Sequence, residues 1–384
     1  MQAFADLSWN IGTQEIPIGK TTLQTGKRYL MNGLSMAIFD FDKEIELLAK
    51  TPIDWSLIDG KTFLITGATG LVGTYFIKML LARNALFGAH IGINAIGRDK
   101  AKFLERFGKN TDRNLVFIKH DMQNPLFCSK IDYIIHAASN THPRAYATEP
   151  IATEMTNIFG TYHLLNMCAK NKHSRFLFVS SGDVYGDNRT IGKPFLTETD
   201  WGYVDCNTLR AGYIEGKRAS EALCNAFKEE KGVDFVIARL CRTFGSTMRL
   251  SSSLAVSQFI LNAVNGEDII LKSKGNQIFS YLYVFDCVSA LLHIITSGES
   301  GGAYNVADNN AAISLSELAG LCAKIGNTTV RFDVPDNLEK KGASTFQDVR
   351  LDCTKLKSLG WEPAFSLEEG LERTIFYLKQ QQGQ

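Results

Sequence analysis

Short apolar runs alternate with longer amphipathic segments between Lys61 and Leu240. The segments with helical spacing predict helices over 71–83, 98–108, 152–171 and 211–231. The apolar runs have the length of buried strands, and they predict strands over 62–66, 91–97, 115–121, 131–138, 175–181 and 234–240. Buried strands that alternate with helices indicate βαβ units. Because such crossovers are right-handed, the pattern predicts an α/β fold with a Rossmann-type, doubly wound parallel sheet.

The segments on either side of this region have a different pattern. Residues 1–58 are mostly polar and loop-like, although DKEIELLAKTP (42–52) has helical spacing that stops at Pro52. We interpret 1–58 as an N-terminal extension that packs on a core and has no catalytic role. After Leu240 helices and strands are mixed. We therefore predict a Rossmann domain over 59–245 and a smaller mixed α/β substrate-binding domain over 246–384, with about 278–298 returning to the Rossmann domain.

Composition and charge exclude several classes of protein. The chain has 384 residues, of which 45% are hydrophobic and 21% charged, as in ordinary globular enzymes. Its net charge of +1 gives no indication of a nucleic-acid or anionic-membrane partner. No apolar run approaches the roughly 18 residues of a membrane span. The eight cysteines are scattered without a CxxC pair, and the N-terminus lacks a signal pattern, so we expect no metal site and a reduced, cytoplasmic setting.

Three glycines separate the first predicted strand from the first predicted helix. Gly67, Gly70 and Gly73 lie in the segment TFLITGATGLVG. Glycines at this place let the backbone approach a pyrophosphate, and the helix N-terminus offers free N–H groups and a positive dipole end. The spacing is GxxGxxG, whereas GxGxxG is the more common dinucleotide-binding form. The segment favours a dinucleotide site, with a tight βα turn of another α/β protein as the alternative.

The end of the second predicted strand bears on the choice of dinucleotide. An acid there binds the adenosine 2′-hydroxyl of NAD, but this strand ends in Gly97 and Arg98. Arg98 can meet the 2′-phosphate of NADP or stack on adenine, or it can be a solvated helix start. Asp99 can still reach a ribose. The sequence therefore leaves NAD and NADP open.

Candidate catalytic residues lie on the last predicted helix and at the end of the fifth strand. Tyr213 and Lys217 are four positions apart, which places both on one helix face. A nearby ammonium favours the phenolate, so we expect Lys217 to lower the pKa of Tyr213 and let it take a proton from a sugar hydroxyl. Ser181, at the carboxyl end of its strand, can hydrogen-bond the same oxygen. The alternatives are a solvated helix face and a serine-rich turn.

The order of these motifs resembles a known family. With DYIIHAAS (132–139), NIFGT (157–161), SSGDVYG (180–186) and LGWEP (359–363), they resemble the extended short-chain dehydrogenase/reductase family over about 60–380. The resemblance is to its nucleotide-sugar epimerases, dehydratases and decarboxylases. It implies NAD or NADP as cofactor, transient oxidation at sugar C4, a nucleotide-sugar substrate, a homodimer, and catalysis by Ser181, Tyr213 and Lys217. The cofactor residues it implies are Gly67, Thr69, Gly70, Leu71, Val72, Gly73, Arg98, Asp121, Met122, Ala137, Ala138, Ser139, Asn157, Tyr213 and Lys217.

The residues after Ser181 distinguish reactions within this family. The 4,6-dehydratases resemble T-D-E-V-Y-G, in which Asp is the acid and Glu the base, whereas this chain has Gly182 and Asp183. Gly182 has no proton to give, which argues against dehydration. Asp183 stands where UDP-glucuronate decarboxylases have Glu. This favours Asp183 as a fourth catalytic residue, which acts at C5 or C6 of the sugar. The alternative is that Asp183 only hydrogen-bonds a loop.

One motif of the decarboxylases is altered. They resemble G-x-Q-T-R-x-F-x-Y-V-x-D, in which the Arg grips the substrate, but GNQIFSYLYVFD has Phe279 at that place. Arg242, Arg249 and Arg350 are then candidates to bind the diphosphate or a carboxylate, with structural ion pairs as the alternative. Phe279 or Tyr281 can stack on a base.

Four hypotheses remain. The favoured one is a nucleotide-sugar enzyme that retains its NAD(P), either UDP-glucuronate decarboxylase-like or a C4/C5 epimerase. The others are a 4,6-dehydratase, an NADPH-dependent reductase of a small ketone, and a redox-sensing protein without catalysis. The last is least favoured because Ser181, Tyr213 and Lys217 are all present.

Overall fold

The computed structural model describes residues 39–109, 112–128, 130–141, 146, 148–333 and 347–383. Residues 1–38 of the predicted N-terminal extension lie outside the described residues. By its internal contacts the chain forms two units, Met1–Phe39 and Asp40–Gln384. The sheets, helices and cavity of the described residues lie in the second unit.

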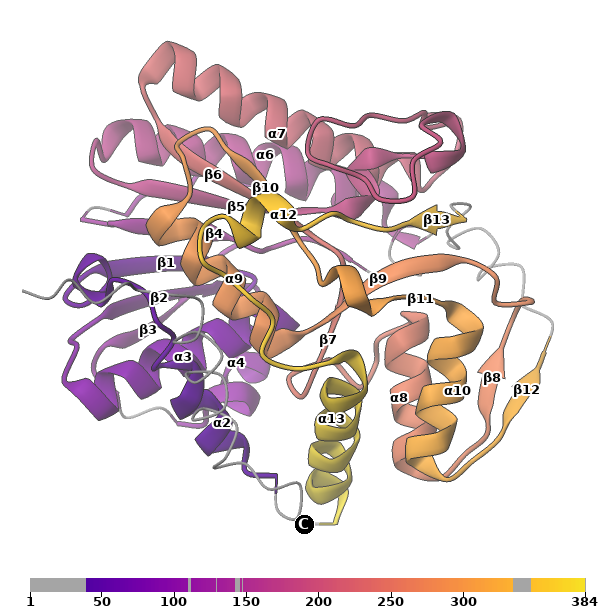
Figure 1. The fold of residues 1–384 in the computed structure, drawn as a ribbon. Coiled ribbons are helices and arrows are strands. Elements are labelled where there is room, and N and C mark those ends of the chain that lie inside the picture. Colours follow the sequence, from indigo (N-terminus) through magenta and orange to yellow (C-terminus); the bar gives the residue numbers. More distant parts are fainter. Residues whose placement is uncertain are drawn as a thin grey trace, which may run out of the picture. The chain divides into compact units, whose positions relative to one another are not determined.

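A seven-stranded parallel sheet forms the centre of this unit, in the order β10-β6-β5-β4-β1-β2-β3 (Figure 1). All six predicted strands are present, and the predicted Rossmann-type fold is confirmed. The seventh strand, β10, comes from beyond the predicted boundary at residue 245. The strands are β1 (Thr62–Thr66), β2 (Gly92–Gly97), β3 (Leu115–Lys119), β4 (Tyr133–His136), β5 (Arg175–Ser181), β6 (Asp234–Leu240) and β10 (Ala303–Val306).

Helices cover this sheet. On one face α6 and α7 lie side by side, and on the other α3 packs against α9 (Figure 1). Fully buried apolar side chains fill the space between sheet and helices, among them Phe176, Phe178 and Phe235. The helices are α3 (Leu71–Phe87), α4 (Lys100–Phe107), α6 (Pro150–Lys170), α7 (Ala211–Lys231) and α9 (Val284–Ser297).

The C-terminal part has smaller sheets of its own. In the larger one, β9 lies between β11 and β13 and also pairs with β7, while β8 and β12 pair separately. The helices α8, α10 and α13 pack against one another beside these sheets. Their bounds are β7 (Arg242–Phe244), α8 (Ala255–Asn265), β8 (Ile269–Leu271), β9 (Ile278–Tyr283), β11 (Ala312–Ser314), α10 (Leu315–Gly326), β12 (Val330–Phe332), β13 (Asp348–Val349) and α13 (Leu367–Gln382).

The segment predicted to return to the Rossmann domain divides at residue 284. Its first half, β9, belongs to the four-stranded sheet, whereas its second half, α9, packs on α3 and β6. A short helix, α2 (Phe41–Leu48), packs against α3, and α12 (Thr354–Lys357) lies against β10. Single turns of 3-10 helix are η1 (Trp55–Leu57), η2 (Gly182–Tyr185), η3 (Asn188–Thr190) and η4 (Asn309–Ala311). No helix among the described residues has both the length and the apolarity to cross a membrane.

Candidate active site

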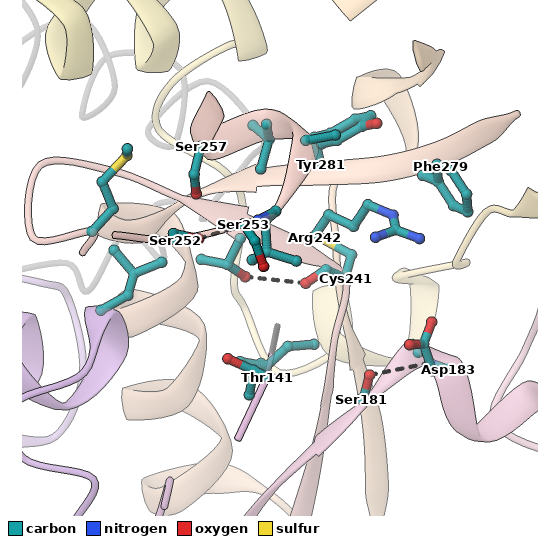
Figure 2. A pocket seen from close by; sticks show the side chains of 18 of the residues that line it. Thr141, Ser181, Asp183, Cys241, Arg242, Ser252, Ser253, Ser257, Phe279 and Tyr281 are labelled. Atoms are coloured by element: carbon teal, nitrogen blue, oxygen red, sulfur yellow. Dashed lines mark hydrogen bonds between the residues drawn. The ribbon is translucent and has the colours of Figure 1, made fainter. Parts of the chain in front are cut away.

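A cavity of about 580 Å³ lies at the carboxyl ends of β1, β4, β5 and β6. The four predicted catalytic residues line it, and Figure 2 shows two of them, Ser181 and Asp183, beside residues of the C-terminal part. The predicted cofactor and substrate residues that also line it are Gly67, Gly70, Leu71, Val72, Gly73, Ala137, Ser139, Arg242, Arg249, Phe279 and Tyr281. One cavity thus joins the glycine turn to the candidate catalytic and substrate residues.

The glycine turn has no room for side chains. Gly67 has a φ of +68°, and a Cβ there would lie 2.6 Å from the Ala137 carbonyl oxygen. A Cβ on Gly73 would lie 2.4 Å from the Gly67 carbonyl oxygen. The helix α3 begins at Leu71, and its N-cap Gly70 offers no side-chain cap, so the first N–H groups are available to an anion. This cradle fits the pyrophosphate of a dinucleotide.

Tyr213 lies in the cavity as the sequence predicts, but its pKa does not follow the prediction. Burial raises the pKa of Tyr213 to about 12, the charge of Asp183 adds to the rise, and the side chains of Ser181 and Tyr146 act in the opposite direction. Lys217 instead donates a 2.8 Å hydrogen bond to the Val179 carbonyl, and burial lowers the pKa of Lys217 to about 7. The expected lowering of the Tyr213 pKa by Lys217 is therefore wrong for the chain alone, because desolvation outweighs any ammonium effect.

Asp183 is held by an arginine that the sequence analysis missed. Arg210 Nη2 lies 2.6 Å from Asp183 Oδ2, and both side chains are largely buried. At the other side of Asp183, its backbone N–H donates to Ser181 Oγ at 3.2 Å, the contact dashed in Figure 2. Asp183 thus forms a largely buried ion pair with Arg210 in the cavity that also holds Tyr213.

A second missed residue is Tyr146, whose ring stacks on Tyr213 with centroids 4.8 Å apart. The Arg210 guanidinium lies 5.3 Å from the Tyr146 ring centroid. Burial raises the pKa of Tyr146 well above its ordinary value, and charges on Asp183, Arg210 and Arg242 act on it in opposing directions. Nothing in the local sequence marks Tyr146, because it is 67 positions from Tyr213 and only the fold brings them together.

The predicted substrate residues separate into two groups. Arg242, Phe279 and Tyr281 lie together in the cavity, with the Arg242 guanidinium carbon 3.6 Å from the Phe279 ring centroid. Arg350 does not line the cavity and forms a two-bond ion pair with Asp348, with Nε to Oδ1 at 2.8 Å and Nη2 to Oδ2 at 2.5 Å. The structural ion pair considered for these arginines is thus present at Arg350.

Arginines gather near the end of β2. Burial lowers the pKa of Arg249, and the positive charge of Arg98 lowers it further. Burial likewise lowers the pKa of Arg106, and the positive charge of Arg249 adds to that lowering. Arg249 therefore lies within electrostatic reach of Arg98, on the side of the cavity where β2 ends. Asp99 is the N-cap of α4, and its carboxylate accepts hydrogen bonds from the N–H groups of residues 101 and 102.

The remaining predicted cofactor residues do not line the cavity. Met122 is buried in the hydrophobic core, and the Asp121 carboxylate accepts a 3.0 Å hydrogen bond from the residue 123 N–H. Asn157 is buried in α6, where its Nδ2 donates to the Thr153 carbonyl. Of the predicted cofactor residues, those that do not line the cavity are Thr69, Arg98, Asp121, Met122, Ala138 and Asn157. Within the described ranges no group of three or more His, Cys, Asp or Glu is arranged to hold a metal ion.

Residues 63–307 match the model of the NAD dependent epimerase/dehydratase family. Among curated proteins, UDP-glucuronic acid decarboxylase 1 of Xenopus tropicalis is 32% identical over 330 residues, which cover 84% of this chain and 73% of that protein. UDP-glucuronic acid decarboxylase 5 of Arabidopsis thaliana is 30% identical over 309 residues, or 80% of this chain and 86% of the relative.

Solved structures agree in fold. UDP-glucose 4-epimerase of Thermotoga maritima, crystallised with UDP-glucose, has a TM-score of 0.71 at 23% identity, covering 84% of this chain and 99% of that one. UDP-glucuronic acid 4-epimerase of Bacillus cereus, crystallised with UDP-glucuronic acid and NAD, has a TM-score of 0.70 at 21% identity, covering 83% and 99%.

Proposed function

Since the chain belongs to the NAD dependent epimerase/dehydratase family, we propose that it is a nucleotide-sugar enzyme that decarboxylates UDP-glucuronate or a closely similar nucleotide uronate. Its cofactor is NAD. The observation that carries the proposal is the cluster of Ser181, Asp183, Arg210 and Tyr213 in one cavity with the glycine turn. A plain ketone reductase needs no buried carboxylate–arginine pair beside its tyrosine.

In this proposal Tyr213 handles the proton of the sugar C4 hydroxyl. Ser181, which lines the same cavity, would hold the same sugar oxygen and orient it. When bound, NAD would supply the hydride acceptor for C4, and the same hydride would return to the C4 ketone at the end, so no external oxidant or reductant is consumed. Tyr213 has a pKa of about 12 in the chain alone, where Lys217 is already present, so the phenolate would form only with the additional positive charge that bound NAD would bring.

Loss of carbon dioxide then follows from the chemistry of the intermediate. A C4 ketone makes the C6 carboxylate of a uronate a β-keto acid. The C5–C6 bond breaks, carbon dioxide leaves, and the electron pair forms an enolate with its negative charge on the C4 oxygen, where Tyr213 and Ser181 donate hydrogen bonds. A proton must then reach C5. Asp183, fixed by Arg210, is the carboxyl group of this cavity that can order a water for that step.

A second candidate is C4 epimerisation of the same uronate. Phe279 favours it, because the decarboxylases that the chain resembles have an arginine at that place. Both candidates share the oxidation at C4 and differ in whether the C5–C6 bond breaks.

We further propose that the protein is a cytoplasmic homodimer that supplies sugar donors for polysaccharide biosynthesis. All eight cysteines are unpaired, which supports a reducing compartment. Large apolar side chains are exposed on α6, namely Ile151, Phe159 and Tyr162, and a second copy would cover them. Light scattering of the purified chain, with Phe159→Ser as the variant, tests the dimer, and a monomeric wild type would refute it.

The test of function is incubation of the purified protein with UDP-glucuronate and with no added cofactor. Mass spectrometry should find a UDP sugar that is lighter by one carbon dioxide. An unchanged mass with a new NMR sugar spectrum would replace decarboxylation by epimerisation. No turnover until NADPH is supplied would refute both candidates. Tyr213→Phe, which keeps the ring and removes the hydroxyl, is the matched inactive control.

A further inference from the structure

We propose that Arg242, positioned by the ring of Phe279, binds a negatively charged oxygen pair of the substrate. This inference rests on the proposed function, since it concerns the substrate of the same cavity. The oxygen pair belongs either to the uronate carboxylate or to the diphosphate, which share the geometry that a guanidinium recognises.

The backbone places Arg242 beside the catalytic residues. Ser181 of β5 pairs with Leu240 of β6 in the parallel sheet, so the segments that follow these two strands leave the sheet at the same place. Asp183 follows on one of them and Arg242 on the other. Arg242 then begins β7, which pairs in register with β9 at Tyr281. Because alternate residues of a strand share a face, Phe279 and Tyr281 present their rings on the same side.

The side chain of Arg242 is stacked but unpaired. Its guanidinium carbon lies 3.6 Å from the Phe279 ring centroid, which is the distance of a face-to-face stack (Figure 2). No residue that the structure describes gives this guanidinium a hydrogen bond or an ion pair, and its Nε is buried without a partner. Stacking fixes the plane of the group and leaves its N–H edge free. Buried donors without partners are rare in folded proteins, so an unsatisfied edge in a cavity indicates a ligand.

The other cations near the reacting residues are already engaged. Arg210 pairs with Asp183 at 2.6 Å, and Lys217 donates to the Val179 carbonyl at 2.8 Å. Asp183 is thereby unavailable to Arg242, whose charge nevertheless reaches Tyr146, the ring stacked on Tyr213. An anion held by Arg242 would therefore lie close to the reacting end of the substrate.

The identity of residue 279 is consistent with this role. A second arginine at 279 would put two unpaired cations in contact, whereas a phenylalanine gives the Arg242 guanidinium an aromatic face. The Arg242–Phe279 pair therefore supplies one positive charge at this wall of the cavity. The charge comes from Arg242 on β7, whereas in the decarboxylases that the chain resembles it would come from an arginine at position 279 on β9.

The test compares the binding of UDP-glucuronate, UDP-glucose and UDP to wild type and Arg242→Met by isothermal titration calorimetry. Because the interaction is a charge-assisted pair, we expect the variant to lose about 10- to 100-fold in affinity. Loss for UDP-glucuronate alone identifies the carboxylate, and equal loss for all three ligands identifies the diphosphate. Arg331→Met is the control for loss of a surface cation, because Arg331 is exposed and paired with Asp268, and neither residue lines the cavity.

A rescue variant separates charge from folding. The double change Arg242→Asn with Phe279→Arg moves the cation to β9 and should recover most of the affinity that Arg242→Asn loses. Unchanged affinity in a folded Arg242→Met protein would overturn the inference while leaving the proposed function intact. If wild type binds none of the three ligands, the proposed function fails, and the role of Arg242 fails with it.

Discussion

Replacing Glu44 by alanine tests whether α2 is an integral part of the enzyme core. Glu44 is fully buried, and its carboxylate accepts hydrogen bonds from the phenols of Tyr75 and Tyr283, the latter at 2.7 Å. Its other oxygen lies 3.3 Å from Nη1 of Arg373, whose side chain is 11% exposed. These partners come from α3, β9 and α13, so one carboxylate joins four elements.

The size of the effect follows from these partners. Removing one member of a buried ion pair costs about 3–5 kcal/mol, because it leaves the other charge buried and uncompensated. Unfolding entropy is about 2.1 cal/mol/K per residue, and the unit has roughly 345 residues. The melting temperature should therefore fall by roughly 4–7 °C. Differential scanning calorimetry at pH 7 measures it.

Two further variants control this experiment. Glu46→Ala removes a carboxylate of the same helix that is only partly buried, and it should change stability by less than about 0.5 kcal/mol. Burial raises the pKa of Glu44, so the folded chain holds its proton more tightly than the unfolded chain. The stability of wild type relative to Glu44→Gln should therefore fall as the pH rises above about 4.5. A loss below about 1 kcal/mol in Glu44→Ala would refute the reasoning.

Three further predictions concern the cavity. Tyr213→Phe should lower turnover at least about a hundredfold in an assay with no added cofactor, because the proton path from the sugar hydroxyl is lost. A change of only a few-fold would contradict the catalytic role of Tyr213. Asp183→Asn should keep NAD binding, slow product formation and lower the pKa of Tyr213, because Asp183 raises that pKa and Arg210 remains; phenolate absorbance against pH measures it, and an unmoved titration would count against the charge coupling. NADP should bind within about tenfold of NAD, because Asp99 is occupied as a helix cap and Arg98 lies near Arg249; calorimetry with both dinucleotides decides, and a hundredfold preference for NAD would be the contrary result.

The regular elements around the cavity could be predicted because their signals are local. The apolar run TFLIT became β1, and the predicted helix 211–231 is α7 with the same bounds. Positive φ at Gly67 and the clash that any Cβ would make there explain why the turn needs glycine. The edge strand β10 was predicted as part of the C-terminal domain, because its four residues carry no signal of which sheet they join.

The candidate site could be predicted only in part. Tyr213 and Lys217 are one helical turn apart, so their spacing alone puts them on one face. The effect of the Lys217 ammonium on the Tyr213 phenol depends on the other groups that bind the ammonium. In the fold, Lys217 Nζ donates a hydrogen bond to the Val179 carbonyl. Helix geometry is thus readable from spacing, whereas a pKa depends on burial and on charges brought in from elsewhere.

Periodicity and turn chemistry act between neighbours in the chain, so the alternation of strands and helices, the glycine turn and the residues available for proton transfer follow from the sequence. Which side chains meet across long separations depends on the folded arrangement. Asp183 meets Arg210, Tyr146 stacks on Tyr213, Arg242 stacks on Phe279, and Arg350 is withdrawn into a pair with Asp348. Such contacts arise where crossovers bring separate strand ends to one edge of the sheet, and the desolvation there sets which charges are paired and which remain open to a ligand.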